Sequence, residues 1–208
     1  MKNTAGKVEF SIALFFIAHL WSALLLAQAI PVGQAQYGIG TLVVVRTDGV
    51  EDRLRGRGAV ILFEQDIVRT EQASQGLLDL GEGIRLAMNE NTSIQILSRW
   101  EKSSGVTKIV RVKKGQVWAK SAAGGKPLEV ETATGTVLLH NAEIDVSVSE
   151  TGQSVLSVIQ GTAQFATPLG WCTVNASTSS SAARGKGCSP AAKANVPQLL
   201  AWTKELLK

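Results

Sequence analysis

Short runs in which apolar and polar residues alternate follow one another along most of this chain. Between residues 40 and 176 these runs are rich in Val, Ile, Leu and Thr, and turn residues interrupt them roughly every ten positions. No apolar spacing of about 3.6 residues, which would indicate a helix, persists over this region. The pattern predicts an all-β fold of many short strands, arranged as a sandwich or roll or as a short β-solenoid.

The N-terminal residues follow a different pattern. Residues 10–30 contain no Lys, Arg, Asp or Glu, two lysines precede them, and small-residue patterns occur at 27–29 and 33–35. These features are typical of a secretory signal peptide occupying residues 1–35. An apolar run of about 20 residues is also long enough to remain as a membrane anchor. Both interpretations predict an N-terminal signal or anchor helix and export of the rest of the chain, with membrane contact only through this segment.

Beyond the strand-like region the composition changes twice. Residues 168–194 are small and polar, which predicts a strand or two with a loose loop, or a partly mobile linker. In residues 195–208, Leu199, Trp202 and Leu206 follow a helical spacing, which predicts a short amphipathic C-terminal helix. Its apolar face would dock on the β-strands of the same chain or, alternatively, on a partner groove or a membrane surface.

Composition narrows the class of protein. The chain has 208 residues, 45% of them apolar and 18% charged, which is typical of a globular protein with one core of ordinary size. The net charge of +4 is small, and basic residues are interspersed with acidic ones. A nucleic-acid partner is therefore not expected.

The two cysteines fit an exported protein. Cys172 and Cys188 lie close in sequence, and in an oxidising compartment they would close a loop of about 17 residues. Free buried thiols are the alternative. A metal pair or a nucleophile is disfavoured, because the spacing is not CxxC and no histidine is nearby.

Between residues 40 and 167, the order of the short motifs resembles the FecR domain family. The stretch VILFEQDIVRTEQASQGLLDL resembles the family's opening element, with Gln65 where glycine is usual before Asp66. LGEGIRLAMNENTSIQIL and VRVKKGQVWAK resemble the elements that follow. LEVETATGTVLLHNAEIDVSV resembles the V-x-T-P-x-G and GTxF elements, with Ala133 in place of proline and Asn141 in place of glycine. SVLSVIQGTAQF resembles the closing hairpin, with Gly161 at its turn or bulge.

The resemblance implies a domain of the bacterial periplasm or cell envelope. In well-known family members this domain stands between a cytoplasmic part that binds a sigma factor and a region that contacts an outer-membrane transporter. Neither part is evident here, since nine residues precede the apolar run and no βαβ pattern follows Thr167. The expectation is a stand-alone exported FecR-domain protein that has an unknown protein or envelope component as its partner.

No catalytic residues and no cofactor are expected. The histidines are His19, in the apolar run, and His140, at a predicted strand end, and no metal-binding or phosphate-binding spacing occurs. Two basic groups could form a binding surface, because Arg and an exposed Trp suit carboxylates, phosphates or sugars. The alternative is an ordinary solvated loop and polar sheet face. The residues concerned are Arg53, Arg55 and Arg57, which would point the same way in an extended chain, and Lys113 and Lys114, beside a predicted turn, with Trp118 on the next strand.

The favoured function is therefore a non-catalytic, exported binding or scaffold module. One alternative is a membrane-anchored envelope sensor or regulator, which requires that residues 10–30 remain as an anchor. A less favoured alternative is an envelope enzyme that processes glycans, for which the sequence offers no catalytic site.

Overall fold

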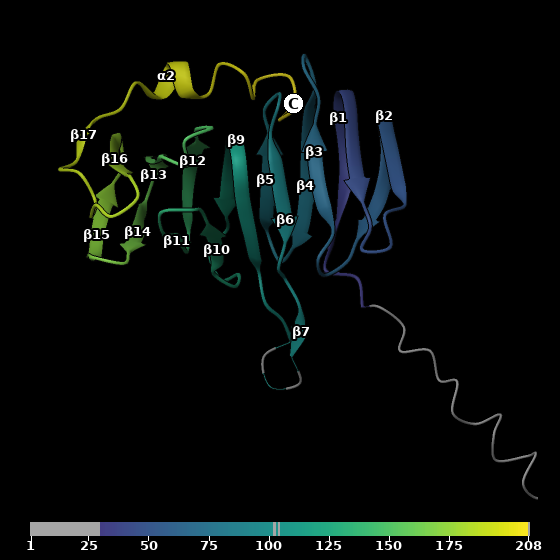
Figure 1. Ribbon diagram of the computed structural model, residues 1–208, viewed down its shortest axis with the longest axis horizontal. Coiled ribbons are helices and arrows are strands. Elements are labelled where there is room, and N and C mark those ends of the chain that lie inside the picture. The colour runs from purple at the N-terminus through teal and green to yellow at the C-terminus, as the bar shows by residue number, and fades with distance from the viewer. Residues whose placement is uncertain (1–29, 102, 104, 208) are drawn as a thin grey trace, which may run out of the picture.

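A computed structural model describes residues 30–101, 103 and 105–207. The signal peptide or anchor helix expected in residues 1–35 therefore lies almost wholly outside the described residues. Figure 1 shows the strands ranged side by side along the long axis, with β2 at one end and β15 and β16 at the other. No helix within the described ranges is both long enough and apolar enough to cross a membrane.

The predicted all-β fold is confirmed, and hydrogen bonds join fifteen strands into one continuous sheet that folds into two layers. The strands are β1 (Gly33–Val45), β2 (Glu51–Leu62), β3 (Ile67–Thr70), β4 (Gln75–Gly81), β5 (Ile84–Met88), β6 (Ser93–Ile96), β9 (Ile109–Ser121), β10 (Leu128–Glu131), β11 (Thr136–Leu139), β12 (Ala142–Val148), β13 (Ser154–Gln160), β14 (Thr162–Thr167), β15 (Gly170–Asn175), β16 (Thr178–Ala182) and β17 (Ala192–Lys193). A separate hairpin comprises β7 (Trp100–Glu101) and β8 (Gly105–Val106).

Two long strands, β1 and β9, belong to both layers. The first half of β1 pairs with β4 and its second half with β3. In β9, residues 109–114 pair with β6 and β10, and residues 115–121 pair with β5 and β12. The first layer thus runs β1–β4–β5–β9–β12–β13–β16–β17, and the second runs β1–β3–β6–β9–β10–β11–β14–β15. Strand β2 lies along the outer edge of β1.

Each long strand changes layer at a glycine. Gly40 has φ +70° and Gly115 has φ +96°, a conformation that side chains disfavour. A Cβ at Gly115 would lie 2.5 Å from the Cα of Thr92. The Thr92 hydroxyl also accepts the Gln116 N–H at 3.0 Å, so the corner is closely packed and bonded. The turn predicted at Lys114–Gly115 is therefore wrong, because β9 passes through this point as one strand with a corner.

Alternation along the strands builds one core between the layers. In β12, for example, Ile144 and Val146 face inward and are almost completely buried. Phe165 of β14 is the largest fully buried side chain of the opposite layer. Gly161 has φ +80° at the turn between β13 and β14. The hairpin predicted there is wrong, because β13 pairs with β12 and β16 of the first layer while β14 pairs with β11 and β15 of the second, so the chain changes layer at this glycine.

The small, polar residues after Thr167 form three strands, β15, β16 and β17, and a loop that the disulfide closes. Cys172 of β15 in the second layer is bonded to Cys188, which follows β16 of the first layer, and their Cα atoms are 6.4 Å apart. The Ser189 N–H donates to the Ser181 carbonyl at 2.8 Å, so the loop after β16 folds back on that strand. The disulfide therefore joins the two layers at the end of the molecule remote from β2.

The C-terminal helix predicted over residues 195–208 is wrong in extent. Only α2 (Val196–Leu199) is helical, and the residues after it form successive turns. The N–H groups of Ala201, Thr203 and Leu206 donate three residues back instead of four. A short isolated helix is marginal without tertiary support, and here the apolar side chains of the segment pack against the sheet. The expected docking on the strands of the same chain does occur.

Gly115→Ala should lower the free energy of unfolding by more than about 3 kcal/mol, because strain at positive φ adds to the contact with the Thr92 backbone. Gly124→Ala is the matched control, since Gly124 has φ +78° and no atom lies within 4 Å of the place that a Cβ would take, and it should cost about 1 kcal/mol. Urea unfolding of both variants measures the difference, and equal losses would contradict the corner.

Replacing both Cys172 and Cys188 with serine should lower the free energy of unfolding by about 3 kcal/mol, because the disulfide restricts the unfolded chain over a 16-residue separation. Urea unfolding of the variant and of the reduced wild-type chain should show the same loss. An unchanged midpoint in both would contradict a stabilising role for this bond.

Candidate functional site

The C-terminal segment, residues 195–207, crosses the outer face of the first layer. It runs from β17 towards β4 and β5 (Figure 1). Leu206 packs in one apolar cluster with Leu77, Ala87 and Trp118, which are cross-strand neighbours on β4, β5 and β9. Three further side chains of the segment border this cluster: Leu200, Trp202 and Leu207. A face that would otherwise be solvated is thus covered by the chain's own terminus.

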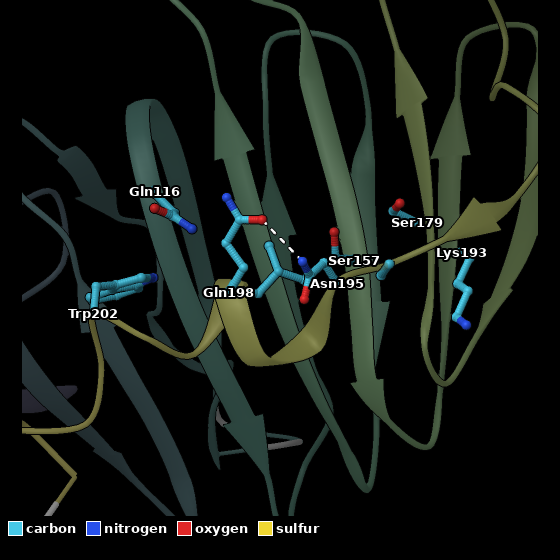
Figure 2. Close-up of a pocket in the computed structure, with 9 residues that line it drawn as sticks. Gln116, Ser157, Ser179, Lys193, Asn195, Gln198 and Trp202 are labelled. Atoms are coloured by element: carbon cyan, nitrogen blue, oxygen red, sulfur yellow. Dashed lines mark hydrogen bonds between the residues drawn. The ribbon is translucent and has the colours of Figure 1, made fainter.

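A pocket of about 410 Å³ lies between this segment and the strands. Its floor consists of Gln116, Ser157 and Ser179, on β9, β13 and β16, and the segment supplies Asn195, Gln198 and Trp202. Figure 2 shows Trp202 beside Gln116 at one end of the pocket and Lys193 at the other. Most of the lining groups are neutral amides and hydroxyls, so the pocket suits water or a small polar molecule better than an apolar ligand.

Asp145, beneath this segment, is the most unusual ionisable group of the described chain. It occupies the outward-facing row of β12 between Trp118 and Ser157, yet it is only 2% exposed. The Gln116 side-chain amide donates to both of its oxygens, at 2.9 and 3.1 Å. Burial raises the pKa of Asp145 to about 7, although the Gln116 amide and the nearby Trp202 indole both act to lower it. This residue was not predicted from the sequence, because nothing around it in the chain indicates that its face is covered.

Trp118 is not the exposed aromatic that the sequence predicted. It is 3% exposed, and its indole N–H donates to Glu143 at 2.9 Å. The C-terminal segment covers it, because Leu206 packs in the same cluster. Trp118 is therefore removed from the predicted binding surface.

The three arginines of β2 are exposed but do not share one direction. Gly56, at φ +71°, bends the strand between them. Arg53 and Arg55 pair with the second half of β1 and Arg57 with its first half. Arg53 forms ion pairs with Glu51 and Glu71, at 2.9 and 3.1 Å. A row of three free guanidinium groups on one face is therefore not present.

The lysine pair lies apart from the arginines. Lys113 and Lys114 are exposed at the corner of β9, and Lys114 forms an ion pair with Glu150 at 3.1 Å. Three strands separate β9 from β2 in either layer, which places the two basic groups roughly 20 Å apart. They do not form one continuous basic surface.

An exposed apolar patch at the β14–β15 hairpin was not predicted. Trp171 is 70% exposed and Leu169 67%, and Ala166 pairs with Trp171 across the hairpin. Leu138 of β11, on the other side of β14, is 38% exposed. We call these four residues the hairpin patch. A hollow of about 390 Å³ borders it, lined by residues 131–136 and 166–168. Nothing in the local sequence indicated that this face stays open.

The described residues show no arrangement for metal binding. No cluster of three or more His, Cys, Asp or Glu within them could hold an ion. His140 is exposed at the end of β11, where its Nε2 lies 3.1 Å from the Gly125 carbonyl oxygen. Lys108 is 6% exposed, and its ammonium group donates to the Leu80 carbonyl, while burial lowers its pKa. Its single close partner is a main-chain carbonyl, which indicates a structural role.

Comparisons with known proteins show which family part of the chain matches. Residues 66–164 match the family described as FecR protein. No curated protein matches the chain. Two crystal structures of a "putative anti-sigma factor" from Parabacteroides distasonis ATCC 8503, at 1.65 and 2.50 Å resolution, share the fold with TM-scores of 0.56 and 0.55. Their identities to this chain are 15% and 14%, so the likeness concerns the fold alone.

Both alignments cover 65% of this chain and 63% of the other, so the chain spans less than two thirds of that protein's length. The family match extends from the residue before β3 into β14 and includes most of both layers. It confirms the resemblance over the greater part of residues 40–167. The chain therefore has a FecR family match at residues 66–164.

Proposed function

We propose that this chain is a non-catalytic, exported regulatory module of the bacterial periplasm or cell envelope that acts by binding another protein. The FecR domain supports this proposal, because it accounts for the larger part of the two layers. The anti-sigma factor name of the Parabacteroides protein is in keeping with regulation through protein contacts. The export of this chain is part of the proposal.

The hairpin patch is the observation that carries the binding role. Isolated exposed apolar residues are ordinary, but here Leu138, Ala166, Leu169 and Trp171 occupy neighbouring strands beside a hollow. Trp is one of the residues enriched at the energetic centres of protein interfaces. Trp171 immediately precedes Cys172, so the disulfide holds its backbone in place. Such an anchor loses little conformational freedom on binding.

The basic residues are proposed as secondary contacts. Arg55, Arg57 and Lys113 are exposed and could meet carboxylates of a partner at positions away from the hairpin patch. Contacts of this kind influence the rate and specificity of association more than its affinity.

The second candidate function is a membrane-anchored sensor, which requires that residues 10–30 stay in the mature protein. Strand β1 begins at Gly33, so an anchor ending near residue 30 would leave about three residues before the domain. Such an anchor would hold the end of the molecule that carries β1 and β2 close to the membrane surface. The hairpin patch, at the opposite end, would face away from the membrane (Figure 1).

A photoreactive amino acid at position 171 should crosslink one discrete partner protein in intact cells. Replacing Trp171 with alanine should then weaken the purified complex at least about tenfold, because a central apolar anchor is lost. Trp100→Ala is the matched control: Trp100 is 50% exposed on the separate β7–β8 hairpin and should leave the affinity unchanged. Equal crosslinking at positions 100 and 171, or unchanged binding by the Trp171 variant, would rule out the hairpin patch.

If the leader is cleaved, the mature protein should begin at Ile30 rather than at Gln36. Cleavage after Ala35 would remove Val32 and Ala35, which are 3% and 0% exposed, and the bond from the Val32 N–H to the Leu62 carbonyl. N-terminal sequencing of the exported protein tests this. A start at Gln36 would contradict the prediction, and a full-length species in the membrane fraction would favour the anchored sensor.

A further inference from the structure

The C-terminal segment is held to the body almost entirely by side chains. The last backbone hydrogen bond between this end of the chain and the two layers runs from the Ala194 N–H to the carbonyl of Ser177, in the turn between β15 and β16, at 2.9 Å. Among the described residues from 195 to 207, the backbone N–H groups that form bonds find their acceptors within the segment. Because α2 has only four residues, the segment has little structure that would persist without the sheet. Its attachment is therefore a local equilibrium that can open without unfolding the two layers.

The buried polar groups under the segment are incompletely paired. Asp145 has one close side-chain donor, the Gln116 amide, which is itself held by Asn89 at 2.9 Å. The nearby Trp202 indole N–H is buried and meets no acceptor at hydrogen-bonding geometry among the residues that the structure describes. A carboxylate in such a place loses its hydration and gains few donors in return. The closed segment therefore favours the neutral carboxylic acid, whereas an open segment would let water reach Asp145.

We propose that residues 195–207 form a strap that opens and closes over the outer face of the first layer, and that the ionisation of Asp145 sets the balance between the two positions. The open strap exposes the apolar cluster of Leu77, Ala87 and Trp118, so the same balance controls whether this face is available. This inference concerns the chain by itself and does not depend on the hairpin patch.

The direction of the pH effect follows from the two states. With the strap closed, burial raises the pKa of Asp145 to about 7, and in the open state it returns towards the ordinary value of 3.8. The closed strap is therefore most stable in acid, loses stability as the pH rises from about 4 to 7, and changes little above that. The population of the closed form relative to the open one falls by up to about tenfold for each pH unit in this window.

Other charged groups near the strap do not reproduce this effect. On the same outer face Glu143 pairs with Lys120 at 3.4 Å and accepts the Trp118 N–H, one row away from Asp145. The strap and its approach carry Lys193, Lys204 and Glu205, all exposed. β13 contributes Ser157 beside Asp145, which is uncharged. Burial is the largest cause of the raised pKa of Asp145, and no neighbouring charge is among its causes.

Hydrogen–deuterium exchange of the strap amides between pH 5 and 7.5 tests the proposal, with rates corrected for the chemical exchange rate at each pH. In the wild-type chain the protection of residues 200–207 should fall by up to about a hundredfold between pH 5 and 7. Asp145→Asn keeps the shape of the side chain but cannot ionise, so its protection should not vary with pH. Glu143→Gln neutralises the neighbouring carboxylate of the same face and should retain the wild-type response.

Two reference measurements make the outcome decisive. Leu206→Ser removes an anchor that is 4% exposed, and it should give the low protection of the open strap at every pH. Amides of β12 and β13 should stay protected throughout, which shows that the layers remain folded. Wild-type strap protection that is independent of pH, the same fall in Asp145→Asn as in the wild type, or loss of β12 and β13 protection in parallel with the strap would each overturn the proposal. If Asp145→Asn does not fold, the wild-type and Glu143→Gln profiles decide by themselves.

Discussion

The passage of β1 and β9 from one layer to the other is the constraint on which the rest of the structure depends. A strand that must serve two layers has to turn a corner without losing its hydrogen bonds, and at Gly40 and Gly115 the neighbouring chain leaves no room for a Cβ. Hydroxyls secure both corners: the Thr41 N–H donates to Ser74, and the Gln116 N–H donates to Thr92. Because the corners fix where each layer begins, they also fix which side chains face the core.

The corner in β9 also determines the chemistry of the outer face. Directly after Gly115 the chain places Gln116 and Trp118 outward on the first layer, beside Asp145 of β12. The C-terminal segment then covers this row, and a carboxyl that would be solvated on an open sheet becomes buried. A binding role at the hairpin patch and a movable strap over the first layer involve different layers of the molecule. One domain could therefore contact a partner and respond to pH through separate parts of its surface.

Two positions depart from the glycines of the family pattern, and the structure shows the backbone conformation at each. Gln65 and Asn141 stand where the FecR family usually has glycine, and both adopt positive φ, at 71° and 52°. This is a conformation that glycine adopts without strain and that asparagine tolerates better than most other residues. Asp66, beside Gln65, accepts the Phe63 N–H at 2.8 Å and an ion pair from Arg46 at 2.6 Å. These bonds give a physical reason for an aspartate at position 66, which the sequence comparison matched only as part of the family pattern.

Strand composition and the alternation of faces were determined by the sequence itself, because they depend on neighbours within a few residues. Which face is covered was decided only by the tertiary structure. Trp118 and Trp171 both lie in strands, yet one is 3% and the other 70% exposed. The C-terminal segment covers the first layer, whereas no segment within the described ranges covers the hairpin patch. The same long-range packing limits α2 to four residues and buries Asp145. A contact between residue 145 and a segment more than fifty positions later leaves no local pattern in the sequence.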